Sequence, residues 1–274
     1  MQKIKMFLLI LSALFTALWT FQPISTADVC FIAHRGYSYR YLQNTTEAFQ
    51  KAGEAGFGGA ETDVRMTSDG VFVLSHNETV VLKSGKELVV ADNTFAALTA
   101  EPLKNRYTKT KLYLCTLQEY LEICKAYDMI CFIELKEEWP AEQILEVFRC
   151  AQESYDLSRC EFQSFELSNL LVAHEAFPTL RIMLTCEEWN DDVEEALRLG
   201  FEIDMNYENL TKEIVARFHD RQLKVACYKA NSAGKILYCA SLGADYIESD
   251  TGTGLRLQHL ETANCFFRGS KERQ

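Results

Sequence analysis

The feature that most constrains the fold is a regular alternation of apolar, strand-like runs with segments of helical length. Eight apolar runs begin near residues 29, 60, 130, 161, 180, 202, 223 and 244. Strands that alternate with helices of about 10–15 residues are typical of parallel βαβ units. Eight such units predict an α/β fold closed into a (β/α)8 TIM barrel, and an open doubly wound sheet is the alternative.

The ends of the helices carry their own signals. Asn44, followed by Glu47, predicts a capping box for a helix that ends before Gly56. Thr116 predicts the start of another helix. Residues 78–112 lack a clear period, which predicts a long loop or a small excursion from the barrel.

Charged side chains lie at the ends of three apolar runs. His34 follows the first run, Glu61 and Asp63 are two apart in the second, and Glu134 and Lys136 are two apart after the third. Residues two apart on a strand share one face. The carboxyl ends of barrel strands meet at the end of the barrel that carries the active site. We therefore predict that these five residues converge there.

The residue types predict a cation with acid and base groups around it. The three carboxylates Glu61, Asp63 and Glu134 favour one divalent cation, Ca²⁺ or Mg²⁺, over zinc. His34, and His76 after the short run Val71–Ser75, are suited to general acid and base catalysis near neutral pH.

Two basic residues complete a set suited to phosphodiester cleavage. Arg35 offers a fork that fits a phosphate, and Lys136 offers a point charge for a developing oxyanion. A buried ion-pair network is the structural alternative, but such pairs stabilise a fold poorly. The sequence holds no GxGxxG after the first strand, so a dinucleotide site has no support.

The motifs that carry these residues form an ordered set. They are His34-Arg35-Gly36, Gly59-Ala60-Glu61-Thr62-Asp63-Val64, Thr67-Ser68-Asp69-Gly70 with His76, Ile133-Glu134-Leu135-Lys136, Ser164-Phe165, Asn231, and Gly243 to Asp250. In this order and spacing they resemble the glycerophosphodiester phosphodiesterase (GDPD) family over the whole chain after the N-terminal segment.

The resemblance implies a TIM barrel of the PLC-like phosphodiesterase type that hydrolyses glycerophosphodiesters to glycerol phosphate and an alcohol. It implies His34 and His76 as the acid/base pair, Glu61, Asp63 and Glu134 as ligands of the divalent cation, and Arg35, Lys136 and Tyr228 as substrate contacts. In this family a glycerol hydroxyl is thought to attack phosphorus and give a cyclic intermediate.

Three positions differ from the family pattern. Gln43 replaces a glutamate, Asn77 replaces an aspartate, and Tyr228 replaces a tryptophan. Two other functions therefore stay open. One is a phospholipase D-like activity on lysophospholipids, for which Tyr37, Tyr39 and Tyr41 would supply an apolar rim or a lid. The other, of a different class, is an inactive surface binding module.

Composition and the N-terminus indicate the setting. The net charge is −11 and no Lys/Arg-rich run is present, which argues against nucleic acid as a partner. Lys3 and Lys5, an apolar run to Phe21 and small residues to Ala27 predict a signal peptide over 1–27, with a signal anchor as the alternative, before a barrel domain over 28–274. The mature protein would be secreted or attached to the outer face of the cytoplasmic membrane.

The ten cysteines include no CxxC pair, and we expect most to be buried thiols.

Overall fold

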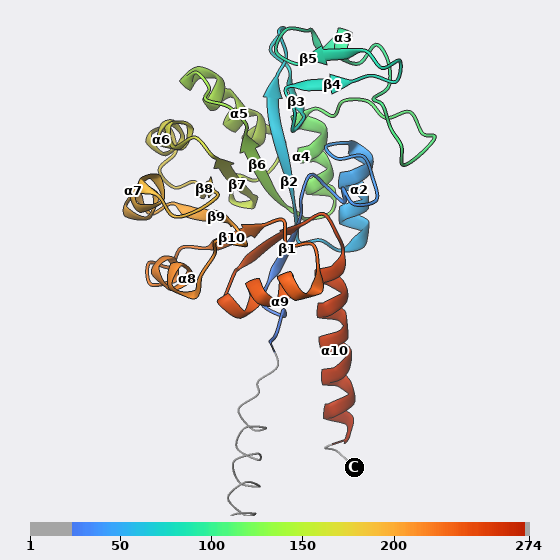
Figure 1. Ribbon diagram of the computed structural model, residues 1–274. Coiled ribbons are helices and arrows are strands. Elements are labelled where there is room, and N and C mark those ends of the chain that lie inside the picture. Colours follow the sequence, from blue (N-terminus) through green and yellow to red (C-terminus); the bar gives the residue numbers. More distant parts are fainter. Residues whose placement is uncertain (1–23, 272–274) are drawn as a thin grey trace, which may run out of the picture.

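The computed structural model describes residues 24–271, and most of the predicted signal segment lies outside them. Its centre is a closed barrel of eight parallel strands (Figure 1). They are β1 (Cys30–Ala33), β2 (Gly59–Met66), β6 (Ile130–Leu135), β7 (Cys160–Ser164), β8 (Ile182–Cys186), β9 (Glu202–Asn206), β10 (Val225–Tyr228) and β11 (Tyr246–Ser249). Each pairs with the next, and β1 pairs with both β2 and β11. The predicted TIM barrel is confirmed, with each strand close to its predicted position.

Helices cover the outside of the barrel. They are α2 (Thr46–Ala55), α4 (Leu117–Ala126), α5 (Ala141–Ser154), α6 (Leu167–Ala176), α7 (Asp191–Leu199), α8 (Lys212–His219) and α9 (Ala233–Leu242), with a short 3-10 turn, η1 (Leu157–Arg159). A last helix, α10 (Thr253–Lys271), projects away from the barrel (Figure 1). The sequence analysis did not predict α10, because the alternation of strands and helices on which the prediction rested ends at the eighth strand.

The caps confirm one predicted helix start and correct another. Thr116 caps α4, as predicted, and together with Glu119 it forms a full capping box. The predicted cap at Asn44 is wrong, because the hydroxyl of Thr45 accepts from the N–H of Ala48 instead. Asn44 has a φ of 55° and turns its amide toward the barrel. An asparagine tolerates this left-handed backbone better than most residues, which frees its side chain for the site.

Two apolar layers hold the barrel together. Between strands and helices, rings such as Phe148 and Phe162 pack with centroids 4.1 Å apart. Inside the barrel, a smaller cluster contains Ile32, Phe132 and Met183, all fully buried. Burial of one such side chain contributes about 1.5–3 kcal/mol. Because strand side chains alternate in direction, the residues two positions further along each strand also point inward, at the mouth.

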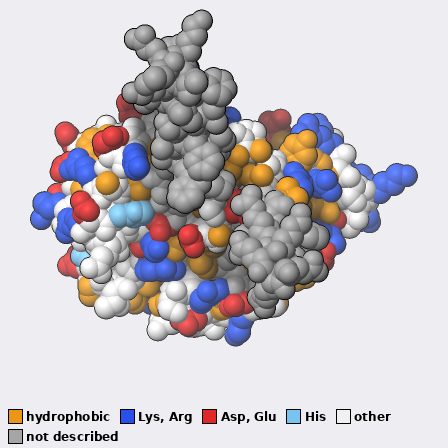
Figure 2. Space-filling model, turned by 90° about the horizontal axis from the view of Figure 1, so that it is seen from below, with side chains coloured by type: hydrophobic (Ala, Val, Ile, Leu, Met, Phe, Trp, Pro, Cys, Tyr) orange, Lys and Arg blue, Asp and Glu red, His pale blue; other side chains and the backbone are white. Residues whose placement is uncertain are grey.

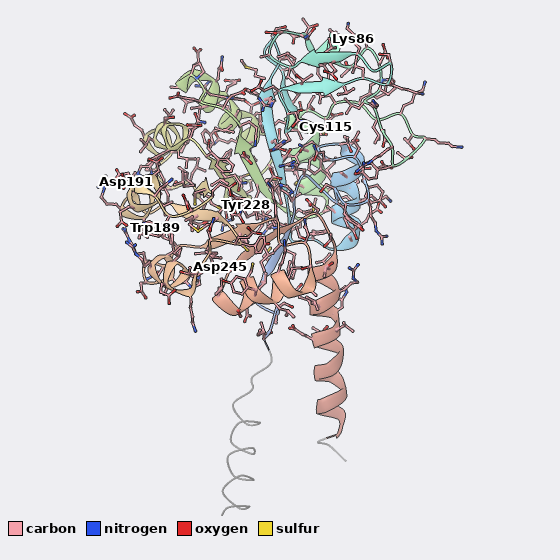
Figure 3. The ribbon with its side chains drawn as sticks, in the orientation of Figure 1. Lys86, Cys115, Trp189, Asp191, Tyr228 and Asp245 are labelled. Carbon is pink, nitrogen blue, oxygen red and sulfur yellow. The ribbon has the colours of Figure 1, made fainter. Side chains whose placement is uncertain are left out.

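The segment after the second strand forms a small separate unit at the mouth. β3 (Phe72–Leu74) pairs antiparallel with β2, and the hairpin β4 (Thr79–Val81) and β5 (Glu87–Val89) follows, with α3 (Phe95–Leu98). Buried apolar residues from β3, β4, β5 and α3 form a core of their own. Figure 3 shows Lys86, at the hairpin turn, far from the barrel axis. The predicted excursion is therefore a hairpin unit.

The face from which α10 projects shows basic and acidic side chains interspersed rather than sorted by sign (Figure 2). Among the described helices, none is both long enough and apolar enough to cross a membrane. The cysteines whose side chains the structure describes are all free thiols, and most of them are buried, in agreement with the prediction.

Candidate active site

The carboxyl ends of the strands surround a pocket of about 210 Å³. Six predicted site residues line it: His34, Arg35, His76, Glu134, Lys136 and Tyr228. The other two, Glu61 and Asp63, are buried next to them on β2. The structure therefore brings together every residue that the sequence analysis assigned to the site.

Glu61, Asp63 and Glu134 form a carboxylate trio. One oxygen from each lies within 4.8 Å of the other two. The register of the barrel causes this proximity, because Asp63 and Glu134 are direct partners on neighbouring strands. Oε1 of Glu61 is buried without a hydrogen-bond partner, and burial, followed by the charge of Asp63, raises the pKa of Glu61 well above its usual value. An all-oxygen set with an orphaned carboxylate oxygen fits a hard divalent cation.

Basic groups already compensate part of this charge. Asp63 lies 3.2 Å from Nε of Arg35 and 3.3 Å from Nζ of Lys136, and it accepts a 2.7 Å hydrogen bond from Nδ2 of Asn44. Lys136 also donates to Glu134 over 2.7 Å. Burial alone would raise the pKa of Asp63, but these partners outweigh it and hold that pKa below its usual value.

The backbone at Arg35 is in the left-handed region, with a φ of 58°. A non-glycine residue held there costs on the order of 1–3 kcal/mol. The conformation lets the N–H of Arg35 donate to Oε2 of Glu61 over 2.8 Å. Gly36 follows with a φ of 77°, and a Cβ there would lie 2.8 Å from the backbone of Ala48. The tight turn therefore requires Gly36, and it holds the N–H of Arg35 in position to donate to Glu61.

His34 is oriented by Asp250, which lies at the end of β11. Nδ1 of His34 is 2.6 Å from Oδ1 of Asp250. Burial would raise the pKa of Asp250, but the His34 and Asn231 hydrogen bonds lower it to about 2, so this carboxylate is ionised and can only accept. Burial also lowers the pKa of His34. The neutral ring therefore carries its proton on Nδ1 and leaves the Nε2 lone pair free.

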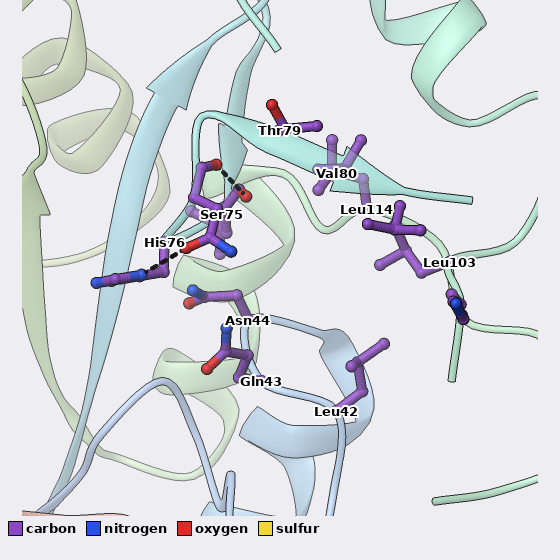
Figure 4. A pocket seen from close by; sticks show the side chains of 13 residues that line it. Leu42, Gln43, Asn44, Ser75, His76, Thr79, Val80, Leu103 and Leu114 are labelled. Carbon is purple, nitrogen blue, oxygen red and sulfur yellow. Dashed lines mark hydrogen bonds between the residues drawn. The ribbon is translucent and has the colours of Figure 1, made fainter. Parts of the chain in front are cut away.

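His76 follows β3 and lies between the pocket and a groove (Figure 4). Its Nδ1 is 2.9 Å from Oδ1 of Asn77, and its backbone oxygen accepts from Arg65 over 3.0 Å. Partial burial lowers the pKa of His76. Asn77, a departure from the family pattern, thus still supplies an acceptor that orients the ring.

Tyr228 contributes its ring to the pocket. Figure 3 shows it near the centre of the molecule, whereas Trp189 lies at the edge. Its hydroxyl donates to the backbone oxygen of Cys186 over 2.9 Å, and its ring meets Phe165 edge-on at 6.3 Å. The hydroxyl is therefore committed to the scaffold, and the ring forms the wall.

The sequence analysis missed several residues of the site. Asn231 and Asp250, which orient His34, were placed among the family motifs but were given no role, and Asn44 was assigned to a helix cap. Gln163, Thr185, Asp204 and Glu248 also line the pocket. The available signal was a polar alternation inside apolar strands, as in Glu202, Asp204 and Asn206 on β9.

Known proteins match both the sequence and the fold. The profile of the glycerophosphoryl diester phosphodiesterase family matches residues 34–251. The chain belongs to this family. A glycerophosphodiester phosphodiesterase of Bacillus altitudinis is 27% identical over 234 residues, which cover 80% of this chain and 93% of that protein.

Solved structures agree with the fold. A glycerophosphodiester phosphodiesterase of Thermotoga maritima has a TM-score of 0.65 and 26% identity, over 86% of this chain and 98% of that one. An Oleispira antarctica phosphodiesterase, solved with the product sn-glycerol-3-phosphate, has a TM-score of 0.73 and 20% identity, over 82% of this chain and 94% of that one. The latter similarity is one of fold.

Proposed function

We propose that this chain hydrolyses glycerophosphodiesters to glycerol phosphate and an alcohol, with a divalent cation at the trio and with His34 and His76 as the acid/base pair. The observation that carries the proposal is the pairing of His34 with an ionised Asp250 beside three buried carboxylates.

Glu61, Asp63 and Glu134 would hold the cation, Ca²⁺ or Mg²⁺, which would neutralise charge on the phosphoryl oxygens when bound. Arg35 and Lys136 line the pocket beside the trio, where both now pair with Asp63. When the cation binds the carboxylates in their place, these two basic groups would bind the phosphate. The ring of Tyr228 would exclude water from one side of the substrate.

The histidines would move the protons. Nε2 of His34 would accept the proton of the attacking hydroxyl as its oxygen bonds to phosphorus, and Asp250 would stabilise the imidazolium. His76 would donate a proton to the departing alcohol oxygen as the other P–O bond breaks. If the nucleophile is a glycerol hydroxyl, water would open the cyclic phosphate with the two roles reversed.

A groove beside His76 favours lysophospholipids as a second class of substrate. It has a volume of about 190 Å³, and His76 lines both this groove and the pocket. Figure 4 shows the side chains that line the groove. Apolar side chains form much of its wall, among them Leu42, Val80 and Leu103. Such a wall fits an acyl substituent. Tyr39 is 67% exposed near the mouth, whereas Tyr37 packs on Phe57 and forms no rim.

The test is to incubate the purified chain with glycerophosphocholine and with lysophosphatidylcholine, in Ca²⁺ or Mg²⁺ and then in EDTA. We expect metal-dependent turnover of the first substrate, and turnover of the second would assign a role to the groove. His34→Ala and His76→Ala should each lower kcat by at least about 10²-fold. His259→Ala, at an exposed position on α10, is the matched control. Absence of turnover with any metal would refute the proposal.

We also propose that residues 1–27 direct export and that the processed domain is 28–274, either secreted or held at the outer face of the cytoplasmic membrane. The run from Met6 to Phe21 and the small residues before Asp28 support this. The partners of the processed protein would be small-molecule substrates and, at most, a membrane surface. N-terminal sequencing of the product from an export-competent host tests it: a chain that keeps Met1 in the cytoplasm would contradict it.

A further inference from the structure

A second group of buried acids lies one step deeper in the barrel. Alternate strands β2, β7, β9 and β11 point Glu61, Gln163, Asp204 and Glu248 inward, each only 1% exposed. In most TIM barrels, bulky apolar side chains fill such a layer. Three carboxyl groups in place of apolar residues are stable there only if they take up protons or if a positive partner binds them.

Among the residues that the structure describes, none forms an ion pair with Asp204 or Glu248. Lys229 lines the same pocket, and its charge opposes the burial that raises the pKa of Asp204. Both carboxylate oxygens of Asp204, Oε1 of Glu61 and Oε1 of Gln163 are buried without a hydrogen-bond partner. Glu248 receives one long hydrogen bond, of 3.5 Å, from Nε2 of Gln163. Arg35 and Lys136, which compensate Asp63, form no ion pair with Asp204 or Glu248.

One nitrogen faces the same space. A ring nitrogen of His34 and one oxygen each from Glu61 and Glu248 all lie within 4.8 Å of one another. Nδ1 is held by Asp250, so Nε2 is the atom available to a ligand, and it lies 4.0 Å from Oε2 of Glu61. A histidine whose other nitrogen donates to a carboxylate is the usual arrangement of a metal ligand.

This cluster differs chemically from the carboxylate trio. The trio offers oxygen alone, whereas one imidazole and two carboxylates suit Zn²⁺, which takes nitrogen and oxygen ligands in a tetrahedral site. The unpartnered oxygens of Asp204 and Gln163 add negative potential behind the cluster. The two sites share Glu61, so it would bridge the two ions.

We propose that His34, Glu61 and Glu248 form a second metal site that binds Zn²⁺, and that zinc there inhibits the reaction. The inhibition rests on the proposed function, because the Nε2 lone pair of His34 cannot coordinate zinc and accept a proton at once. The site itself does not depend on that function.

Equilibrium dialysis of the full chain against ⁶⁵Zn²⁺ in saturating Ca²⁺ tests the site. Glu248→Gln should raise the zinc dissociation constant at least tenfold. Glu248→Leu should do the same, and because an apolar side chain suits this buried position, we expect the variant to fold. Glu187→Gln, which lines the same pocket outside the cluster, should bind zinc as the wild type does. If zinc binds both Glu248 variants as tightly as it binds the wild type, it is held elsewhere, for example by cysteine, and the proposal is overturned. The proposal is also overturned if the wild type binds no zinc.

The inhibition is measured as the rate of each variant relative to its own rate without zinc. The wild type and Glu187→Gln should lose activity as the zinc site fills, and Glu248→Gln should need at least tenfold more zinc for the same loss. Equal zinc sensitivity of all three would overturn the inhibitory role. If no variant turns over a glycerophosphodiester, the proposed function fails, while the dialysis still decides on the metal site.

Discussion

Asp250→Asn should uncouple His34 from catalysis while the pocket keeps its shape. In the wild type, the backbone N–H of Asp250 donates to Oδ1 of Asn231 over 2.8 Å, and Ser249 donates to the same oxygen over 3.0 Å. These bonds fix Nδ2 of Asn231 as a donor toward Oδ2 of Asp250, 2.6 Å away. The carboxylate thus receives donors on both sides, from Asn231 on Oδ2 and from His34 and the hydroxyl of Ser38 on Oδ1.

An amide at position 250 cannot satisfy both neighbours. If its oxygen faces His34, its NH₂ meets the NH₂ of Asn231, and two half-buried donors lose their partner, at a cost of up to about 1–3 kcal/mol. If its oxygen faces Asn231, its NH₂ faces Nδ1 of His34 and forces the ring proton onto Nε2. The wrong tautomer removes the base, and kcat/KM should fall by about 10²–10⁴-fold.

The pH profile distinguishes positioning from a general structural defect. The ionised Asp250 favours the imidazolium form of His34, while burial opposes that form and lowers the pKa of the ring. Without the carboxylate, the pKa of His34 falls further, so the acid limb of kcat/KM should move to lower pH. The assay is kcat/KM for glycerophosphocholine between pH 4 and 9.

A double variant, D250N/N231D, provides the control. A carboxylate at position 231 would accept from the new amide, which frees the amide oxygen to accept from Nδ1 of His34. The double variant should regain at least about tenfold of the lost rate, because the tautomer is restored. If D250N keeps a rate within threefold of the wild type and an unchanged acid limb, this account of His34 is wrong.

Three further outcomes follow from the same contacts. Asn44→Gly keeps the left-handed backbone but removes the amide that donates to Asp63, and urea denaturation should show a loss of about 1–3 kcal/mol; an unchanged midpoint would contradict the buried contact. Thr116→Ala removes a cap far from the pocket, so it should cost about 1 kcal/mol and about 2–4 °C in Tm, with kcat unaltered; an equal loss of kcat would argue against the placement of the site. Because the pKa of Asp250 is depressed to about 2, its stabilisation is complete above its usual value near ~4 and disappears as the pH falls to about 2. The stability difference between wild type and D250N should vanish over that range, and a difference that persists at its lower end would refute the assigned shift.

The barrel and its mouth could be predicted because both depend on local patterns. Each strand is a short apolar run between helices with recognisable starts, and the carboxyl end of every strand lies at the same face. Glu61, Asp63 and Glu134 could therefore be placed together from their positions at the ends of strands, without knowledge of any contact.

The rest depends on contacts between distant parts of the chain. Asn44 and Thr45 are both good cap residues. The side chain of Asn44 donates to the buried Asp63 instead, which leaves Thr45 to cap α2. Asp204 and Glu248 lie within apolar strands, where a single acid shows neither its direction nor its neighbours. The β4–β5 hairpin has strands of only 3 residues each, too short to show a period.

Closure of the barrel also determines when the protein can first work during its synthesis. His34 and Asp250 are 216 positions apart, and β1 completes its pairing only when β11 is present. A ribosome that has made the first ten strands has produced every proposed metal ligand of the trio but no oriented base. Until β11 emerges, β1 and β10 each present an open edge, which invites pairing with other chains. Catalytic competence and protection from aggregation therefore arrive together, with the last strand.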